Sequence, residues 1–291
     1  MDTRDILRKV RYIEIKTRGL VNQIFSGEYH SVFKGRGIEF SEVREYQYGD
    51  DIRTIDWNVS ARLNHPYVKV FEEERELTVM LVVDLSGSGG FGSTKQLKNE
   101  IATEICAVLA FSAIKNNDKV GLLLFTDKIE KFVSPKKGRA HILRIIRELL
   151  SFQPTSSGTD ITKALEYFNH VSKKRSIAFL ISDFIDDGYD KILRIISRKH
   201  DVIAVELSDP REMALPSAGL LVLRDAETGE QRVVDTGNAV VRNEFERHWR
   251  QRRLDRRGIF VRSKVDAIEV RIDRPYIKPI VDFFRLRERR L

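Results

Sequence analysis

The sequence predicts an α/β fold built on an open, mainly parallel sheet with helices on both faces. Between residues 78 and 207, short runs of Val, Ile and Leu alternate with longer segments of helical periodicity. This alternation is typical of strand–helix units in a parallel sheet. The strand-like runs are apolar throughout, as expected where both faces of a sheet are covered. Right-handed crossovers then place helices on both faces.

The central region is expected to follow a regular order of strand and helix. Strands are predicted over 78–84, 119–125, 176–182 and 202–207, and helices over about 94–115, 138–150, 160–172 and 188–199. Each helical segment carries Ile, Leu or Phe at spacings of three and four, which predicts one apolar face. A short hairpin-like piece is expected near 129–133.

The N-terminal part is expected to differ from this region. Residues 2–25 carry apolar side chains at helical spacing, separated by Arg and Lys, and so predict a helix. Residues 26–70 show no long periodicity, but they hold too many aromatic side chains for a disordered linker. We expect an ordered N-terminal wrapping segment with Trp57 as a core anchor, ending in a strand over 67–77.

The C-terminal part is expected to be an α+β extension. Residues 220–235 read as two strands joined by a turn at 227–229, followed by a basic helix over about 238–257. A short strand near 259–262 and a helix over 275–288 are expected to follow. The chain therefore divides into an N-terminal helix and irregular segment (1–72), a central α/β domain (73–208) and a C-terminal hairpin with basic helices (209–291).

Composition limits the class of protein. The 291 residues carry a net charge of +8, and 32% of them are charged, which suits a soluble globular protein. No apolar run approaches the ~20 residues that span a bilayer, and the first residues lack an export signal. A single cysteine, Cys106, excludes an internal disulfide framework, so we expect a cytoplasmic protein. The positive charge leaves nucleic acid, acidic lipid at a membrane surface or an acidic protein open as partners.

The candidate site begins where the strand over 78–84 ends. Asp84 follows the apolar run, and Ser86 and Ser88 come next at alternate positions. A spacing of two in extended chain points side chains to the same side, and ligands collect beyond the carboxyl ends of such strands. Oxygen ligands suit a hard cation such as Mg²⁺, with Mn²⁺ or Ca²⁺ as alternatives. The competing interpretation is a turn that caps the next helix.

Two further loops carry oxygen ligands in the same order along the chain. Thr159 lies in Gly158-Thr159-Asp160, and Asp183 follows the strand over 176–182. Together with Asp-x-Ser-x-Ser at 84–88, this pattern resembles the metal-ion-dependent adhesion site of von Willebrand factor A-type domains.

That resemblance implies a von Willebrand factor A-like fold with Rossmann-type layering and a non-enzymatic, cation-dependent protein-binding site. The implied metal ligands are Asp84, Ser86, Ser88, Thr159 and Asp183. Because three of these ligands are neutral, the cation keeps residual charge for an acidic residue of the partner. The partner-binding rim is expected at Asp160, Phe184, Gly89 and Gly90.

A narrower resemblance covers nearly the whole chain. It rests on Gly35-Arg-Gly37, Glu39-Phe40, Gly49-Asp50-Asp51, Arg53, Asp56-Trp57, Ser60-Ala61-Arg62 and Phe71-Glu72-Glu73. These residues resemble the signature of domain-of-unknown-function family fifty-eight, which joins it to an A-type domain. The chain departs from the family after Ser88, where Gly89 and Gly90 replace the usual Met and acidic residue. The resemblance implies a MoxR-type AAA+ ATPase as partner, with an adaptor or chaperone-like role in complex assembly or maturation.

An enzymatic interpretation is the minor alternative. Five acidic residues could form a metal-dependent hydrolase site: Glu39, Glu42, Asp50, Asp51 and Asp56. The arginines interleaved with them favour a charge-paired structural network instead. The chain also lacks a phosphate-binding Gly-x-x-x-x-Gly-Lys-Ser/Thr loop and a Gly-x-Ser-x-Gly nucleophile turn, so we expect no enzyme.

Binding to nucleic acid or an anionic surface is the other alternative. The basic helix carries seven arginines, namely Arg242, Arg247, Arg250, Arg252, Arg253, Arg256 and Arg257. They cover too many angles of one helix to face a single duplex, and several are expected to pair with Glu244, Glu246 and Asp255.

Overall fold

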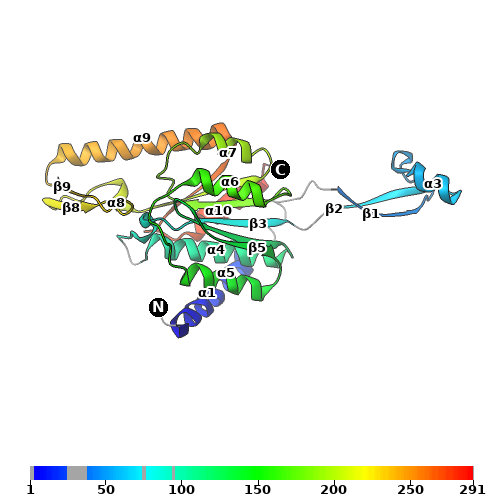
Figure 1. Ribbon diagram of the computed structural model, residues 1–291, viewed down its shortest axis with the longest axis horizontal. Coiled ribbons are helices and arrows are strands. Elements are labelled where there is room, and N and C mark those ends of the chain that lie inside the picture. The colour runs from blue at the N-terminus through cyan, green and yellow to red at the C-terminus, as the bar shows by residue number, and fades with distance from the viewer. Residues whose placement is uncertain (1–2, 25–37, 74–76, 94–95, 291) are drawn as a thin grey trace. The chain divides into compact units, whose positions relative to one another are not determined.

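The computed structural model describes residues 3–24, 38–73, 77–93 and 96–290 (Figure 1). The chain forms two compact units, Phe33–Leu77 and the larger unit of Met1–Val32 with Thr78–Leu291. The N-terminal helix α1 (Thr3–Ile24) belongs to the larger unit, where Lys16 and Glu14 form ion pairs with Glu104 and Arg139. This division differs from the boundary at residue 72 drawn from the sequence, because α1 packs on the central domain and residues 33–77 form a unit of their own.

The larger unit is built on a six-stranded sheet with the order β10-β7-β6-β3-β4-β5. The strands are β3 (Thr78–Asp84), β4 (Lys119–Phe125), β5 (Ile129–Lys136), β6 (Ile177–Ser182), β7 (Asp201–Ser208) and β10 (Asp266–Arg271). All neighbouring pairs are parallel except β4 and β5. The predicted parallel sheet is confirmed, and β10 from the C-terminal region extends it by one edge strand.

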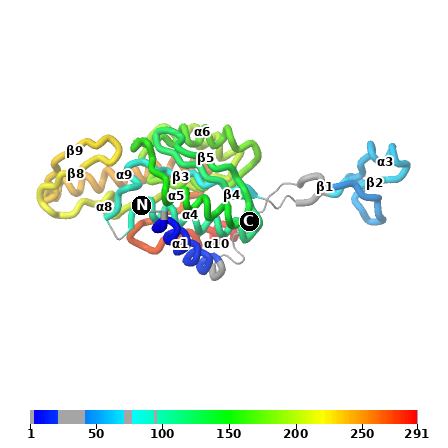
Figure 2. The backbone as a smooth tube through the Cα atoms, turned by 60° about the horizontal axis from the view of Figure 1, so that its bottom comes forward, coloured from blue at the N-terminus to red at the C-terminus, as the bar shows by residue number. Residues whose placement is uncertain are grey.

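Helices cover both faces of this sheet, as predicted (Figure 1). On one face lie α4 (Lys98–Lys115) and α5 (Arg139–Ser151), and α1 lies across both of them (Figure 2). On the other face lie α6 (Ile161–Val171), α7 (Asp190–Ile196) and α9 (Ala239–Ser263). Residues Ile101 to Ala113 of α4 are all buried, because the sheet and α1 enclose the helix from opposite sides.

The central strand β3 shows why these residues form a two-sided core. Met80 and Val82 pack into a cluster with α6, α7 and α9. Val79, Leu81 and Val83 alternate with them and so face α4, and every one of these five side chains is fully buried. Burial on both faces explains why this run is apolar without alternation.

The C-terminal region contains the predicted hairpin and helices, with one error. A short helix, α8 (Pro210–Met213), precedes the hairpin of β8 (Leu220–Arg224) and β9 (Gln231–Asp235), and α10 (Ile277–Glu288) packs beside β10. The strand predicted near 259–262 is wrong, because α9 continues through these residues to a left-handed cap at Lys264. Phe260 is buried in the core cluster, which keeps this stretch helical. Among the described helices, none combines the length and apolar character that crossing a bilayer requires.

The smaller unit is an antiparallel pair of strands with short helices between them. β1 (Ile38–Glu45) pairs with β2 (Tyr67–Glu73), and η1 (Ile52–Thr54) and α3 (Trp57–Leu63) lie in the connection. The expectation for Trp57 was wrong, since its side chain is 69% exposed. Residues 25–37, which hold the start of the family signature, and the Glu39 side chain lie outside the described part of the chain.

Acidic side chains in this unit are held by structural partners. Arg44 donates to both carboxylate oxygens of Asp50 at 2.7 and 2.8 Å. Asp56 caps α3 by accepting hydrogen bonds from the backbone of residues 58 and 59, and Asp51 accepts one from the backbone of Arg53. These contacts support the charge-paired interpretation over a hydrolase site.

Candidate metal centre

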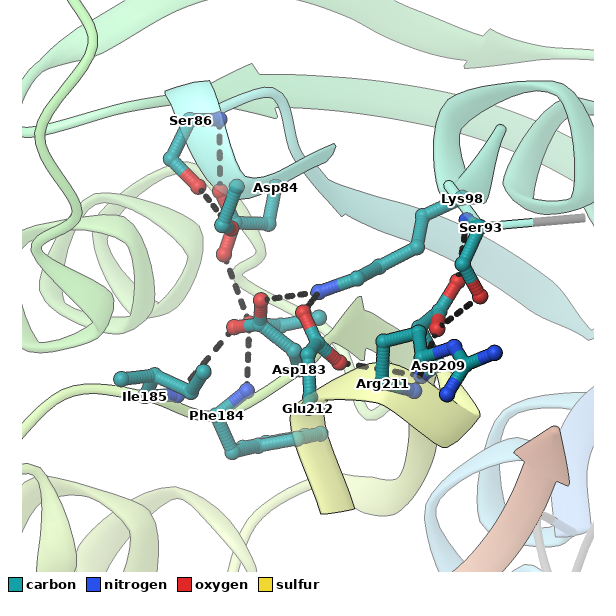
Figure 3. Close-up of polar contacts among 12 residues, drawn as sticks. Asp84, Ser86, Ser93, Lys98, Asp183, Phe184, Ile185, Asp209, Arg211 and Glu212 are labelled. Atoms are coloured by element: carbon teal, nitrogen blue, oxygen red, sulfur yellow. Dashed lines mark hydrogen bonds and ion pairs between the residues drawn. The ribbon is translucent and has the colours of Figure 1, made fainter. Parts of the chain in front are cut away.

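The candidate site lies at the carboxyl ends of β3 and β6, the two strands at the centre of the sheet. Asp84 is the last residue of β3, and Asp183 directly follows β6. The strands are parallel and in register, with Val83 opposite Ile181, so the two carboxylates emerge side by side. Figure 3 shows them within one network of polar contacts.

Four of the five predicted ligands meet in this network. Asp84 accepts hydrogen bonds from the backbone of Ser86 at 2.8 Å and from the hydroxyl of Ser182 at 2.6 Å. The hydroxyls of Ser86 and Ser88 lie 3.0 Å apart, and Ser88 also hydrogen-bonds to Asp183. Burial and the negative charge of Asp183 raise the pKa of Asp84 to about 7.

A buried lysine that the sequence did not indicate supplies the counter-charge. Lys98, at the start of α4, is 2% exposed, and its ammonium donates to Asp183 at 2.8 Å. The same ammonium pairs with Glu212 of α8. Burial alone would raise the pKa of Asp183, but the Lys98 charge outweighs it and holds this pKa below its ordinary value.

A second layer of contacts anchors Glu212. Its carboxylate accepts from the backbone of Asp209 at 2.9 Å, and Asp209 in turn accepts from the backbone of Ser93 at 2.7 Å. Asp209 is fully buried and caps α8. The Lys98 network therefore links the loop after β3, the loop after β6 and the turn after β7 (Figure 3).

The site combines carboxylate and serine hydroxyl oxygens, which are the ligand types that a small divalent cation accepts. Asp183 and the largely buried Glu212 share the ammonium of Lys98, and the buried carboxyl group of Asp84 lies beside them without an ammonium of its own among the described residues. Buried charge of this kind is costly unless it is balanced, and Mg²⁺ accepts carboxylate and hydroxyl oxygens. Among the described residues there is no cluster of three or more acidic, His or Cys side chains arranged for metal binding, so the fit depends on the serine hydroxyls.

Thr159, the fifth predicted ligand, bonds outside this network. It lies just before α6, and its hydroxyl donates to Glu227 at 2.6 Å. Glu227 comes from the turn between β8 and β9, 68 residues away in the chain. Burial raises the pKa of Glu227, and the charges of Asp183 and Asp186 add to the effect. No sequence motif pointed to this glutamate.

The four residues expected at the partner-binding rim divide into two pairs. Asp160 caps α6 through the backbone of Lys163 and is 27% exposed, and Gly90 is exposed. Gly89 is buried, and a Cβ there would lie 2.2 Å from Oδ1 of Asn99. Asp160 and Gly90 are therefore accessible to a partner, whereas Gly89 is not.

The expectation for Phe184 needs correction. Its side chain is 3% exposed and packs edge-on against Phe260 of α9, with ring centroids 5.0 Å apart. The backbone of Phe184 has a φ of 56°, a left-handed conformation unusual for an aromatic residue. This turn directs the ring into the core, so Phe184 contributes packing rather than a rim contact.

Arg256, one of the seven arginines considered for binding nucleic acid or an anionic surface, has a structural role instead. Arg256 is 8% exposed, pairs with buried Glu206, and donates to the backbone oxygens of Asp183 and Phe184 at 3.1 and 3.4 Å. Arg256 holds the loop that carries Asp183, and its buried guanidinium is not accessible to a nucleic-acid duplex. Other arginines of α9 are also engaged: Arg253 and Arg257 with Glu269, and Arg250 with Glu246. These pairings disfavour the helix as a nucleic-acid surface.

The chain matches a protein-family model and is similar in sequence to proteins of mycobacteria. The family model described as "Protein of unknown function DUF58" matches residues 42–255. The uncharacterized protein Rv1480 of Mycobacterium tuberculosis is 30% identical over 292 residues, which is 99% of this chain and 92% of that protein.

The solved structures similar to the chain include two that illustrate the likeness. BatB from Bacteroides thetaiotaomicron is 16% identical with a TM-score of 0.48 and covers 73% of this chain and 99% of its own. The SpRpn10 VWA domain is 9% identical with a TM-score of 0.39, covering 72% of this chain and 95% of its own. The fold is α/β with a mainly parallel sheet, and the chain belongs to the DUF58 family.

Proposed function

We propose that this chain is a non-enzymatic protein-binding module whose binding depends on a divalent cation. The observation that carries the proposal is the pair of buried carboxylates, Asp84 and Asp183, joined by the hydroxyls of Ser86 and Ser88. Lys98 balances only part of their charge and that of Glu212. The cation would be held by Asp84, Ser86, Ser88, Asp183 and Thr159.

When bound, Mg²⁺ would supply positive charge with a preference for oxygen ligands, which suits capture of a partner's carboxylate. The protein orients Asp183 from two sides for this purpose: Lys98 fixes its side chain, and Arg256 fixes its backbone carbonyl. Nothing in the described centre favours covalent chemistry. The one cysteine, Cys106, is fully buried, and burial raises the pKa of its thiol, which opposes thiolate reactivity.

The partner we propose is a MoxR-type AAA+ ATPase, or a client of that ATPase, presenting an acidic side chain. The resemblance to the family signature supports this assignment, and the proposed role is that of a cytoplasmic adaptor in complex assembly or maturation. Asp160 and Gly90, the exposed or half-exposed residues of the rim, would lie at the edge of the contact.

A pull-down with a MoxR-type ATPase from the same genome tests the proposal. Binding in Mg²⁺ should fall at least about tenfold in EDTA, and Asp84→Asn should reproduce that loss, since each good charge-assisted contact is worth about a factor of ten. Asp190→Asn, on the exposed side of α7, is the matched control and should bind normally. Binding that survives both EDTA and Asp84→Asn would contradict the metal-dependent mechanism.

A further inference from the structure

The outward face of the N-terminal helix α1 carries side chains that packing within this chain does not explain. On the inward face, Val10, Ile13 and Val21 are buried, and the helix lies across α4 and α5 (Figure 2). Lys16 pairs with Glu104 of α4 at 2.7 Å. Three large apolar side chains elsewhere on the helix are more than half exposed, namely Leu7, Tyr12 and Ile15. The inward face alone attaches α1 to the domain, so these three side chains are left for another contact.

Four exposed arginines share the outward face with these apolar side chains. They follow one another at spacings of four, three and seven residues: Arg4, Arg8, Arg11 and Arg18. Such spacings place side chains on one side of a helix with 3.6 residues per turn. Ile15 lies four residues after Arg11 and three before Arg18, so it belongs to the same side. The outward face is therefore both basic and apolar.

Little negative charge balances this face. In the part of the chain that the structure describes, three of the four arginines form no ion pair. The fourth, Arg18, lies 3.8 Å from Glu14, but that carboxylate is buried and also pairs with Arg139 of α5. The only other acidic residue of α1 is Asp5. The face therefore keeps a net positive charge.

This combination of groups fits the surface of an anionic membrane. Helices that lie in a membrane interface carry basic residues together with large apolar ones, and tyrosine also favours that boundary. Guanidinium groups bind phosphate oxygens through paired hydrogen bonds, and their long stems reach past neighbouring apolar side chains. A nucleic-acid duplex would engage the arginines but leave the apolar side chains in water. An apolar protein groove would bury guanidinium groups without partners, so charge complementarity favours anionic lipid.

We propose that the outward face of α1 attaches this protein peripherally to membranes that contain anionic phospholipids. The helix lies along the surface, with Leu7, Tyr12 and Ile15 in the interface and the four arginines on lipid phosphates. Its inward face stays on α4 and α5, so attachment requires no unfolding. The cytoplasmic leaflet of a membrane is anionic, which agrees with the cytoplasmic role proposed above. The attachment does not depend on a cation at Asp84 and Asp183, and it is tested separately from the proposed function.

Flotation of the full chain with lipid vesicles in EDTA tests the role of the arginines. Vesicles of phosphatidylcholine and phosphatidylglycerol in equal amounts should bind the protein at least about tenfold more tightly than phosphatidylcholine alone. Arg8→Gln combined with Arg11→Gln should weaken binding to the mixed vesicles about twentyfold, because each arginine at an anionic surface contributes about a factor of five. Arg252→Gln combined with Arg262→Gln is the matched control. It removes the same charge from exposed positions of α9 and should change the affinity by less than about twofold, because salt screens distant charges.

Ile15→Ser tests the apolar part of the contact. This change removes a side chain that is 66% exposed, and it should weaken binding to the mixed vesicles about fivefold. Leu254→Ser, at a position of α9 that is 61% exposed, is the matched control and should bind as the native chain does. Thermal transitions like that of the native chain should confirm that all the variants are folded.

Four results would contradict the proposal. If the native chain does not bind the mixed vesicles, a lipid surface is excluded. If the Arg8 and Arg11 variant binds them as well as the native chain does, α1 is not the contact. If that variant loses binding but Ile15→Ser does not, the contact is purely electrostatic and the insertion of apolar side chains is disproved. Binding to a DNA duplex that requires the arginines, without binding to vesicles, would assign the face to nucleic acid instead.

Discussion

Two regions of this molecule are rich in acidic residues, and they differ in how far the carboxyl groups are buried and balanced by positive charge. At the ends of β3 and β6, the carboxyls of Asp84, Asp183 and Glu212 are buried or nearly so around one ammonium. In the smaller unit, Asp50 is bonded by both arms of the Arg44 guanidinium, and Asp56 caps α3. The first cluster has one ammonium for three carboxyl groups, whereas Asp50 and Asp56 each have their own hydrogen-bond donors.

The pKa values follow this difference. Burial and the neighbouring Asp183 raise the pKa of Asp84, while hydrogen bonds from Arg44 and from the backbone lower the pKa of Asp50. Backbone hydrogen bonds at the start of α3 likewise lower the pKa of Asp56. A functional site is thus better marked by buried, uncompensated charge than by the number of acidic residues.

Removing one positive charge from each region should give the largest difference in stability between the two regions. Lys98→Met leaves Asp183 and Glu212 without their ammonium, and we expect unfolding to become easier by about 4–5 kcal/mol, as for other broken buried ion pairs. Arg44→Met should change stability little, because its ion pair with Asp50 is exposed to solvent. Urea unfolding followed by circular dichroism measures both. Similar losses in the two variants would contradict the contrast.

The next largest effect is expected at Arg256. Replacement by Met leaves Glu206 buried without its guanidinium and frees the backbone carbonyls after β6, at a cost of about 3 kcal/mol. Arg252→Met, at an exposed position of the same helix, is the matched control and should fall within about 0.5 kcal/mol of the native protein. Urea unfolding again provides the measurement. If Arg252→Met were the more damaging change, the structural role of Arg256 would be wrong.

Cation binding gives a smaller and reversible effect. Mg²⁺ at ten times its Kd should stabilise the protein by about 1.4 kcal/mol, a rise in Tm of about 2–3 °C for a chain of this size. Asp84→Asn should abolish this rise, and Asp50→Asn should retain it, because only the first removes an oxygen charge from the uncompensated cluster. Scanning calorimetry with MgCl₂ or EDTA decides the matter. A rise that disappears in Asp50→Asn instead would reverse the assignment of the two regions.

The smallest effect concerns His200, a buried histidine that stays uncharged in the folded protein. Burial lowers the pKa of His200 to about 4, with help from Lys199 and Arg175, below the ordinary value of about 6.5. The unfolded chain therefore takes up a proton that the folded chain refuses. Stability should be constant above about pH 6.5 and fall as the pH drops toward 4.

His200→Gln should flatten this part of the profile relative to the native protein. Urea midpoints at several pH values between 7.5 and 4.5 provide the comparison. Parallel profiles for the two proteins would show that His200 does not contribute to the acid sensitivity.

Much of the sheet and most of the site were predictable, because their signals are local. The run from Thr78 to Val83 is apolar at every position except its first, and strands buried on both faces have this composition. Parallel strands end at one edge of the sheet, so Asp84 and Asp183 had to come together once β3 and β6 were neighbours. The error near 259–262 arose because a short apolar run reads equally well as a strand or as part of a buried helix.

The residues that set the charge of the site were not predictable in the same way. Lys98 opens a helix whose periodicity gives no sign that an ammonium is buried, and Arg256 is one of seven similar arginines on a basic helix. Glu227 lies in a hairpin turn of ordinary composition, where an acidic residue is common. Each gains its role only from contact with an element distant in sequence.

By itself, the sequence determined the order of strands and helices between Thr78 and Ser208 and the oxygens at the ends of β3 and β6. The spacing of apolar residues along a helix or strand indicates which of its faces are buried, and this signal does not depend on which elements pack against it. The tertiary structure alone decided that Lys98 balances Asp183, that Arg256 supports its loop, and that Glu227 faces Thr159. Electrostatic balance depends on distances between segments that chain folding brings together, and those distances leave no local pattern.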